Sequence, residues 1–422
     1  MNRPSEGPQI TLTLDAMAHG GAAIGHYEDR AIFVPYAIPG ERVRVEIIDD
    51  RGRYAHARLL EVIEPAPVRV EPACPFFGEG KCGGCQWQHI ATSVQPQLKG
   101  MVTLDQMRRV GKFQDPPVFE PIADPHGWEY RNHALFRVNE EGRLGFLSSR
   151  SHAVYPVDTC LILHPLLNGV LEALDMNYPE LEWLEMRAGT ATGDIMLLLQ
   201  SREEEPPSLA VDLPVSIVQV RHDDAVAPLI GLDYILERVH DRPFRISATS
   251  FFQVNTTQAE TLVNVVLGAL ELQGHEHVLD AYCGVGLFSA FIASEARHVT
   301  GIEINPSAVA DARHNLADAG NVTVLEGPVE TMITTLEEAP DAVVVDPPRA
   351  GLDRSVIDAL VALAPSRIVY VSCDPATLAR DCRRLARHGY GLAWVQPVDL
   401  FPQTYHIENV ALLTYEPGGA KR

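Results

Sequence analysis

The 422-residue sequence predicts an α/β protein with a β-rich N-terminal part. After residue 251, short apolar runs typical of strands alternate with helix-like stretches, as expected of a parallel sheet covered by helices. A glycine-rich turn, Asp280-Ala-Tyr-Cys-Gly-Val-Gly286, follows the first of these runs. Polar residues follow three later runs, and such folds bind ligands at the carboxyl ends of their strands. The C-terminal part therefore has the layout of an enzyme with a Rossmann-like fold.

Residues 1–67 predict a small OB-like β-barrel, because they contain four short apolar runs separated by glycine and proline turns, at 10–14, 31–35, 43–48 and 57–63. Residues 68–245 are expected to form an α+β middle domain. It begins with a cysteine cluster and a helix at 97–110, and a proline-rich break lies at 205–207. The pattern does not define its topology. Residues 246–422 are the third expected domain.

The net charge of −22 excludes a protein that coats nucleic acid without selectivity. It leaves room for a local basic face, for which Arg51, Arg53 and Arg58 are candidates, with a second group at 108–112. A solvated surface is the alternative for both groups. The chain starts with polar residues, and no apolar stretch is long enough to span a bilayer. We therefore expect a cytoplasmic monomer with no membrane partner.

The glycine-rich turn predicts a nucleoside cofactor site. Gly284 and Gly286 carry no Cβ, which lets the chain pass close beneath a ligand. Glu303 ends the next predicted strand, 23 residues beyond Asp280, where a carboxylate can accept from both ribose hydroxyls. The third glycine of a dinucleotide fingerprint is missing, so S-adenosylmethionine fits better than NAD. The alternative is a tight turn with an incidental acid.

Cys373 is the candidate nucleophile. It follows the predicted strand at 367–372, and Asp374-Pro375 supplies an N-cap and a first-turn proline for a helix at 376–387. The positive end of that helix favours the thiolate, the reactive form of cysteine. A buried structural cysteine is the alternative, and it is the interpretation we adopt for Cys382.

Two carboxylates accompany this thiol. The prolines of Asp346-Pro-Pro-Arg349 form a rigid exit from a strand that aims Asp346 into the cleft. Such a segment also occurs in enzymes that methylate amino groups, so it does not identify the atom that is methylated. Glu408 lies among apolar residues that can raise its pKa, which suits a general base. A solvated Glu408 at a sheet edge is an equally good interpretation.

These motifs together resemble the RNA uracil-5-methyltransferases. The resemblance rests on Phe251-Phe-Gln-Val-Asn255, the glycine-rich turn, Asp-Pro-Pro-Arg, Ser372-Cys-Asp-Pro375 and His406-Ile-Glu-Asn409, in this order. Residues 9–65 also resemble the RNA-binding barrel called the TRAM domain. The resemblance implies a methyltransferase domain that transfers a methyl group from S-adenosylmethionine to carbon 5 of a uridine in RNA.

The resemblance also implies roles for individual residues. Cys373 would add to carbon 6 of uracil, and Glu408 would remove the proton from carbon 5. Four further residues would contact the cofactor or the base: Gln253, Tyr282, Glu303 and Asp346. Leu287 stands where many relatives are expected to have Asn, which removes one hydrogen bond to the cofactor. The uracil must leave its stack to reach the thiol, and Phe251 or Phe252 could stack on it.

Cys74, Cys82 and Cys85 predict a metal site, since both zinc and iron–sulfur clusters use four thiolates. Spacing alone favours zinc. The segment Cys82-Gly-Gly-Cys-Gln-Trp-Gln-His89 resembles the iron–sulfur segment of the family, which implies a 4Fe–4S cluster with Cys160 as the fourth ligand. Seven residues separate Cys74 from Cys82 where five are expected, so we expect a bulge at 78–81.

The sequence thus predicts an enzyme that methylates carbon 5 of a uridine, with 23S ribosomal RNA preferred and transfer RNA as the alternative. Two other classes remain open. An RNA-binding protein could keep the fold without catalysis, although the presence of Cys373, Glu408 and Asp346 argues against it. A methyltransferase acting on an amino nitrogen or a small molecule would form no covalent adduct with 5-fluorouracil RNA.

Overall fold

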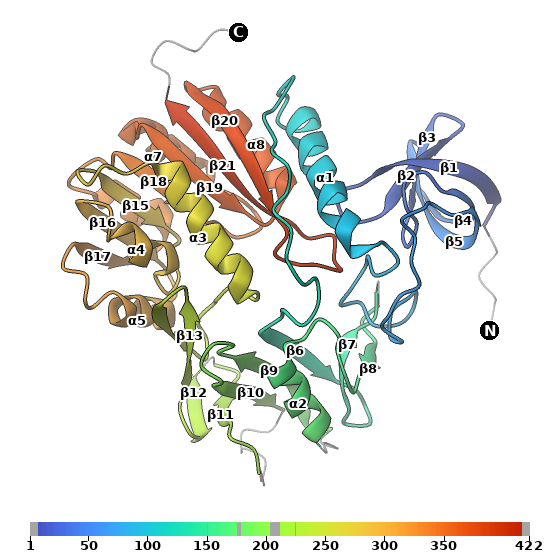
Figure 1. Cartoon of the computed structure of the whole chain (residues 1–422), viewed down its shortest axis with the longest axis horizontal. Coiled ribbons are helices and arrows are strands. Elements are labelled where there is room, and N and C mark those ends of the chain that lie inside the picture. The colour runs from blue at the N-terminus through green and yellow to red at the C-terminus, as the bar shows by residue number, and fades with distance from the viewer. Residues whose placement is uncertain (1–6, 150, 175–178, 203–211, 224, 416–422) are drawn as a thin grey trace.

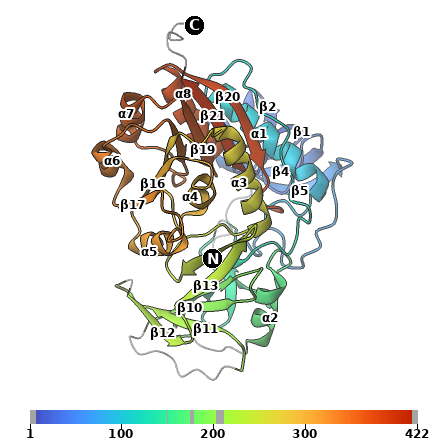
Figure 2. The same ribbon diagram turned by 60° about the vertical axis from the view of Figure 1, so that its left-hand side comes forward.

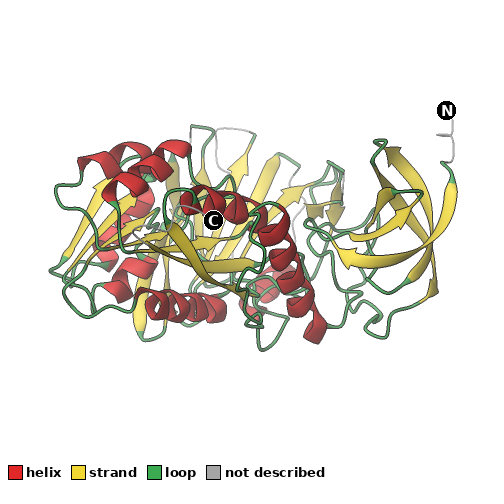
Figure 3. Ribbon diagram, turned by 90° about the horizontal axis from the view of Figure 1, so that it is seen from above, coloured by secondary structure: helices red, strands yellow, loops and turns green. Residues whose placement is uncertain are grey.

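The structure, a computed structural model, describes residues 7–149, 151–174, 179–202, 212–223 and 225–415. A β-barrel and a helix-covered sheet lie at opposite sides of the molecule, and a second sheet lies below them (Figure 1). Seen from above, helix α1 (Gln95–Arg109) stands between the barrel and the helix-covered sheet (Figure 3). The proline-rich break expected at 205–207 lies outside the described residues. In the described part of the chain, no helix is long and apolar enough to cross a membrane.

The N-terminal barrel is closed in the order β1-β2-β3-β5-β4. Its strands are β1 (Gln9–Met17), β2 (Ala23–Tyr27), β3 (Arg30–Val34), β4 (Arg42–Asp50) and β5 (Tyr54–Glu64). The four predicted strands are present, and their alternating apolar residues, such as Leu12 and Leu14, point into the core. The sequence analysis missed β2. This strand is short and contains Gly25, which passes so close to β1 that a Cβ would lie 2.4 Å from the Thr13 carbonyl oxygen.

The middle part contains a seven-stranded sheet in the order β12-β11-β10-β9-β6-β7-β8, with α2 (Pro165–Ala173) contributing to its core. The strands are β6 (His133–Val138), β7 (Leu144–Leu147), β8 (Val154–Pro156), β9 (Leu181–Ala188), β10 (Ile195–Ser201), β11 (Ser216–Val220) and β12 (Val226–Ile230). A separate ribbon of β13 (Tyr234–Val239) and β14 (Arg242–Ser247) leads to the last part. The cysteine-rich segment joins β7, where Gly83 N donates to the Leu147 carbonyl at 3.0 Å.

The C-terminal sheet has seven strands in the order β17-β16-β15-β18-β19-β21-β20. They are β15 (His277–Ala281), β16 (His298–Glu303), β17 (Val322–Glu326), β18 (Ala342–Val345), β19 (Arg367–Ser372), β20 (Tyr390–Val398) and β21 (Glu408–Tyr415). Among these described strands, β21 alone runs antiparallel to its neighbours, so the prediction of a parallel sheet is correct except at this strand.

Helices cover both faces of this sheet. One core contains α3 (Thr256–Leu270), α4 (Leu287–Ile292) and α5 (Pro306–Asn315), and the other contains α6 (Val329–Met332), α7 (Arg354–Leu363) and α8 (Pro375–Ala386). Figure 2 shows α3 lying across the front of the sheet. Strand β18 is buried on both faces, which explains its uninterrupted apolar sequence.

Candidate active site

The glycine-rich turn follows β15 and leads into α4. Tyr282 has φ +67°, Gly284 has φ +55° and Gly286 has φ +87°, all left-handed values that favour glycine. The two glycines serve different purposes. A Cβ on Gly284 would meet no atom within 4 Å, so the turn faces open space there. A Cβ on Gly286 would come 2.9 Å from Leu316, so this glycine allows α4 to pack.

Two carboxylates border the turn. Glu303 accepts hydrogen bonds from the backbone N–H groups of Gly284 at 3.0 Å and Asn305 at 2.7 Å, which fixes it at the end of β16. Asp280 is buried, and its Oδ2 accepts from the amide and hydroxyl of Ser289 at 3.0 and 2.6 Å. Its Oδ1 is also buried and has no hydrogen-bond partner among the described residues. Burial raises the pKa of Asp280 to about 6.

This arrangement fits a nucleoside cofactor with hydroxyl or amino donors. The open space over Gly284 leaves room for it, and Asp280 Oδ1 offers an acceptor that would otherwise be an unfavourable buried group. Gln253 lies buried just before α3, where its carbonyl accepts from the Asn132 side chain at 3.1 Å. Leu287 is buried in the core of the fold, so its apolar side chain packs rather than facing a ligand.

The two candidate stacking residues differ in exposure. Phe251 is 64% exposed, whereas Phe252 is 9% exposed and packs in the core with Phe244 at 6.1 Å between ring centroids. Phe251 can therefore stack on a base. Phe252 cannot, and that alternative is wrong.

Strand order brings the predicted nucleophile and carboxylates together. Strands β18, β19 and β21 are neighbours, and Asp346 and Cys373 directly follow the ends of the first two. Glu408 is the first residue of β21, not a residue after a strand. Because β21 is antiparallel to β19, with Ser372 opposite Asn409, its beginning lies at the edge where the other strands end. Cys373 and Glu408 therefore meet.

The surroundings of Cys373 favour the protonated thiol over the thiolate. Burial, and then nearby Glu408, raise the pKa of Cys373 to about 11, and Arg349 opposes the rise through its charge and a hydrogen bond. Asp374 caps α8 as predicted, accepting from the amides of Ala376 and Thr377 at 3.0 and 2.9 Å. The expectation that the helix end would favour the thiolate is thus outweighed by burial. Thiolate formation depends on the cation beside it.

Arg349 is one residue of this site to which the sequence analysis gave no role. Its Nη2 lies 2.8 Å from His406 Nδ1, so it bridges His406 and the Cys373 thiol. Burial, and then the Arg349 charge, lowers the pKa of His406 to about 4, so the neutral ring accepts from the guanidinium. The motif Asp-Pro-Pro-Arg contains this arginine, but only the folded loop shows where its side chain lies.

The two carboxylic acids keep their protons more strongly than usual. Burial and then Asp280 raise the pKa of Asp346 to about 7. Burial and then Asp346 raise the pKa of Glu408 well above its ordinary value, and Arg349 opposes this. Neighbouring carboxyl groups in a site poor in water disfavour simultaneous ionisation. Perturbed acids beside a nucleophile are typical of catalytic sites.

The barrel also reaches this site. His19, in the turn between β1 and β2, places Nε2 3.3 Å from Asp374 Oδ2. Burial opposes the ionisation of Asp374, but the hydrogen bond from His19 and the capping amides hold its pKa at about 2. The sequence analysis did not identify His19, because no local pattern connects a barrel turn to a residue 355 positions away.

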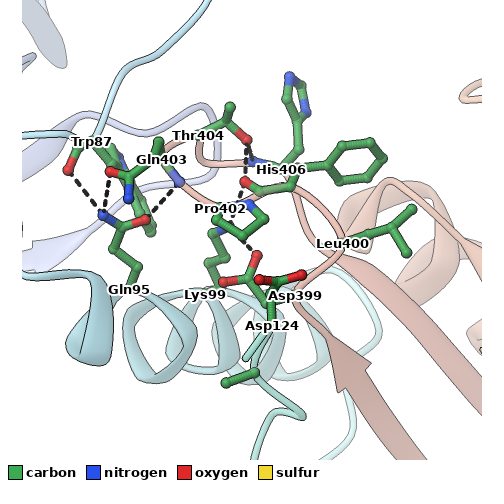
Figure 4. Close-up of polar contacts among 12 residues, drawn as sticks. Trp87, Gln95, Lys99, Asp124, Asp399, Leu400, Pro402, Gln403, Thr404 and His406 are labelled. Carbon is green, nitrogen blue, oxygen red and sulfur yellow. Dashed lines mark hydrogen bonds and ion pairs between the residues drawn. The ribbon is translucent and has the colours of Figure 1, made fainter. Parts of the chain in front are cut away.

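A buried polar network holds the loop that carries His406 and precedes Glu408 (Figure 4). Lys99 of α1 is fully buried, and its ammonium lies 2.6 Å from Asp399 and donates to the Phe401 carbonyl at 3.0 Å. The Gln95 side chain donates to Gln403 Oε1 at 3.0 Å and accepts from the Gln403 amide at 2.8 Å. Helix α1 therefore positions a catalytic loop about 300 residues away.

The arginines proposed as an RNA-binding face are largely engaged by acidic neighbours. Arg51 lies 3.0 Å from Asp49, and Arg58 pairs with Glu46. Two of the three positive charges are therefore balanced on the barrel itself, which weakens this location for an RNA surface.

The four cysteines assigned as metal ligands line one cavity of about 170 Å³, namely Cys74, Cys82, Cys85 and Cys160. The loop between the first two bulges where expected: Gly78 and Gly80 have φ +134° and +70°, and Lys81 N donates to the Gly78 carbonyl at 3.2 Å. Burial, and then the neighbouring thiols, raise the pKa of Cys82 to about 11. Among the described residues, no three Cys, His, Asp or Glu side chains converge on a single-ion position.

Comparison with known proteins agrees with these features. The family model for tRNA (uracil-5-)-methyltransferases matches residues 332–416, a methyltransferase-domain model matches 278–364, and the TRAM domain matches 5–60. An uncharacterized RNA methyltransferase of Halalkalibacterium halodurans is 38% identical over 96% of both chains. One of Streptomyces coelicolor is 36% identical over 96% of this chain and 93% of its own.

A solved structure shares the fold. It is the tRNA (uracil-54, C5)-methyltransferase of Pyrococcus abyssi, with a TM-score of 0.76 and 24% identity over 96% of this chain and 100% of its own. Fold and site together define an S-adenosylmethionine-dependent RNA methyltransferase with an N-terminal TRAM barrel. Within that class, the chain belongs to the RNA uracil-5-methyltransferase family and is an RNA (uracil-5-)-methyltransferase.

Proposed function

We propose that this enzyme methylates one uridine of 23S ribosomal RNA through a covalent adduct between Cys373 and carbon 6 of uracil. The observation that supports it is the meeting of Cys373, Glu408 and Arg349 at one edge of the sheet. A thiol, a buried carboxylic acid and a cation are the groups that addition and elimination at a ring carbon require.

The reaction begins when the Cys373 thiol gives its proton to solvent and the thiolate sulfur bonds to carbon 6 of the flipped uracil. The electron pair of the ring double bond moves toward carbon 5, which becomes nucleophilic. S-adenosylmethionine, when bound, supplies the methyl group that carbon 5 takes. Glu408 as carboxylate then accepts the carbon-5 proton, the double bond forms again, and the sulfur leaves. Cys addition is needed because carbon 5 of uracil is otherwise a weak nucleophile.

Other residues of the site prepare these steps. Arg349 stabilises the thiolate of Cys373 through charge and a hydrogen bond. Asp346 contacts the reacting base, and Gln253, Tyr282, Gly284 and Glu303 hold the cofactor. Gly286 supports this cofactor site by allowing α4 to pack behind the turn. Phe251, exposed beside this segment, stacks on the flipped base.

The cysteine cavity fits a 4Fe–4S cluster, held by Cys74, Cys82, Cys85 and Cys160. Four thiols line one space, and four thiolates are the ligand set that such a cluster requires. Arg131 also lines the cavity and favours the ionised form of Cys160, which helps to balance the negative charge of thiolate ligands. The group has a structural role, since no step of the methylation is a redox step.

Transfer RNA is the second candidate substrate, because the family model that matches residues 332–416 is described for tRNA. The TRAM barrel and the cysteine cavity favour 23S ribosomal RNA, which would place the enzyme in the cytoplasm. Mass-spectrometric mapping of 5-methyluridine in both RNAs, with and without the gene, separates the two. Loss at a ribosomal site supports the proposal, and loss at a transfer RNA site replaces the substrate. No loss in cells, together with no methylation by purified enzyme, contradicts the proposal.

A further inference from the structure

A pocket of about 630 Å³ lies where the barrel, the cysteine loop and the middle sheet meet. Its walls come from the β1–β2 turn (Gly20, Gly21), the residues after β3, the loop between Cys82 and Gln86, the turn between β7 and β8, and Tyr405. The volume lies in the range of ligand sites, roughly 300–1,000 Å³. The proposed methylation uses none of the described residues that line this pocket.

Two connections place the pocket beside the active site. The turn that supplies Gly20 and Gly21 begins with His19, which lies 3.3 Å from the residue after the nucleophile. Tyr405, against which this turn packs, precedes His406, and their ring centroids are 4.2 Å apart. His406 in turn accepts from Arg349. A chain that places one unit at Cys373 can therefore place a neighbouring unit in this pocket.

The pocket is rigidly built on its active-site side. A Cβ on Gly21 would lie 2.7 Å from the Tyr405 ring, so this glycine is needed for the barrel turn to seat against Tyr405. The Trp87 indole donates to the Gly21 carbonyl at 3.0 Å and holds the turn there. Tyr36, on the adjoining wall, has φ +61°, a strained value for a side chain larger than glycine. Strain of this kind clusters at binding sites.

The lining suits a nucleobase. It combines the rings of Tyr405 and Tyr36 with the hydroxyls of Ser149 and Ser151, and the described lining residues include no Asp, Glu, Lys or Arg. Among the described residues, Gln86 Oε1 has no hydrogen-bond partner, so this wall has an unpaired acceptor. Aromatic rings and hydroxyl groups are the side chains that stack on bases of single-stranded RNA and hydrogen-bond to them.

We propose that this pocket binds an unstacked base of the RNA strand adjacent to the target uridine. The inference rests on the proposed function, since it takes RNA as the molecule whose uridine reaches Cys373. The proposal also accounts for the position of the cysteine loop in the wall of the pocket. Gly83 forms part of the pocket wall and is hydrogen-bonded to the middle sheet at Leu147, so ordering of the cysteine cavity orders the pocket.

Filling the pocket tests the proposal. Ser151 is exposed in the β7–β8 turn and lines the pocket, so Ser151→Trp places a bulky side chain in it. The matched control is Ser294→Trp, an exposed serine of the C-terminal part outside the pocket. With 23S ribosomal RNA and transfer RNA transcripts, Ser151→Trp is expected to raise the KM for RNA by about tenfold, the value of one stacked base. The KM for S-adenosylmethionine should not change in either variant.

A second readout does not depend on the variant or on methylation. Transcripts carrying 4-thiouridine are cross-linked to the wild-type protein, and the modified peptides are identified by mass spectrometry. Cross-links at Ser149, Ser151, His152 or Tyr405, from a nucleotide adjacent to the methylated uridine, are the expected result. A wild-type KM in Ser151→Trp without these cross-links would overturn the pocket proposal even if 5-methyluridine forms. Cross-links at these residues without any 5-methyluridine would support RNA binding here and overturn the proposed function instead.

Discussion

The cysteines of the cavity and the cysteine at position 373 all have little contact with solvent, but their neighbours differ. Around the cavity of Cys82 and Cys85, burial and then adjacent thiols raise the pKa values. At Cys373 burial also raises the pKa, but Arg349 donates to the sulfur and opposes the rise. A group of thiols that disfavour one another's ionisation needs a bound metal to be deprotonated. A single thiol beside a guanidinium can ionise transiently, as a nucleophile must.

The largest effect is expected from Cys373→Ala. Methylation of RNA should fall by at least about four orders of magnitude, because the covalent route is closed. Binding of S-adenosylmethionine, measured by calorimetry, should remain. Cys382→Ala is the matched control, since Cys382 is fully buried in the core and away from the cleft. Residual methylation near the wild-type rate would remove Cys373 from the nucleophile's role.

Glu408→Gln separates adduct formation from product release. The glutamine cannot accept the carbon-5 proton, so turnover should fall about a thousandfold, within the range of general base catalysis. The methylated RNA should remain attached to Cys373 and migrate with the protein on a denaturing gel. If turnover falls without an attached intermediate, Glu408 acts before the methyl transfer.

Arg349→Met tests the guanidinium that donates a hydrogen bond to the Cys373 thiol. Without it the pKa of Cys373 rises further above about 11, so less thiolate is present at any pH below that value. A rise of one unit lowers kcat/KM about tenfold near neutral pH and moves the rising limb of its pH profile to higher pH. Arg354→Met is the control, because Arg354 is exposed on α7 and lies 3.9 Å from Asp358. An unshifted limb would show that Arg349 does not act on the thiol.

Cys85→Ser should have the smallest effect on chemistry. The variant is expected to lose the iron of the proposed cluster, measured by elemental analysis, and to unfold at a temperature lower by about 5 °C or more. Its rate should fall by less than about tenfold, or 1.4 kcal/mol, because the proposed cluster takes no part in the proposed reaction. A fall in the methylation rate as large as that of Cys373→Ala would contradict the separate roles given to Cys85 and Cys373. Full stability without iron would argue against a cluster.

Much of the local structure could be predicted from the sequence. The predicted strand that ends at Glu303 is β16, the one predicted at 367–372 is β19, and the Asp374-Pro375 pair begins a helix as expected. These features depend on neighbouring residues, whose spacing is visible in the chain. The sequence analysis missed strand β2 because its five residues contain glycine and histidine instead of a clear apolar alternation.

The sequence by itself determined which residues could do chemistry here: a cysteine before a helix, acids after strands, glycines in a turn and clustered cysteines. Tertiary structure decided which of them meet. Reversal of β21 sets Glu408 opposite Cys373, and the folded loop directs Arg349 toward the thiol. It also brings His19 from the barrel and Lys99 from α1 to the same loops. Such contacts join residues hundreds of positions apart through packing and burial, which leave no periodic trace in the chain.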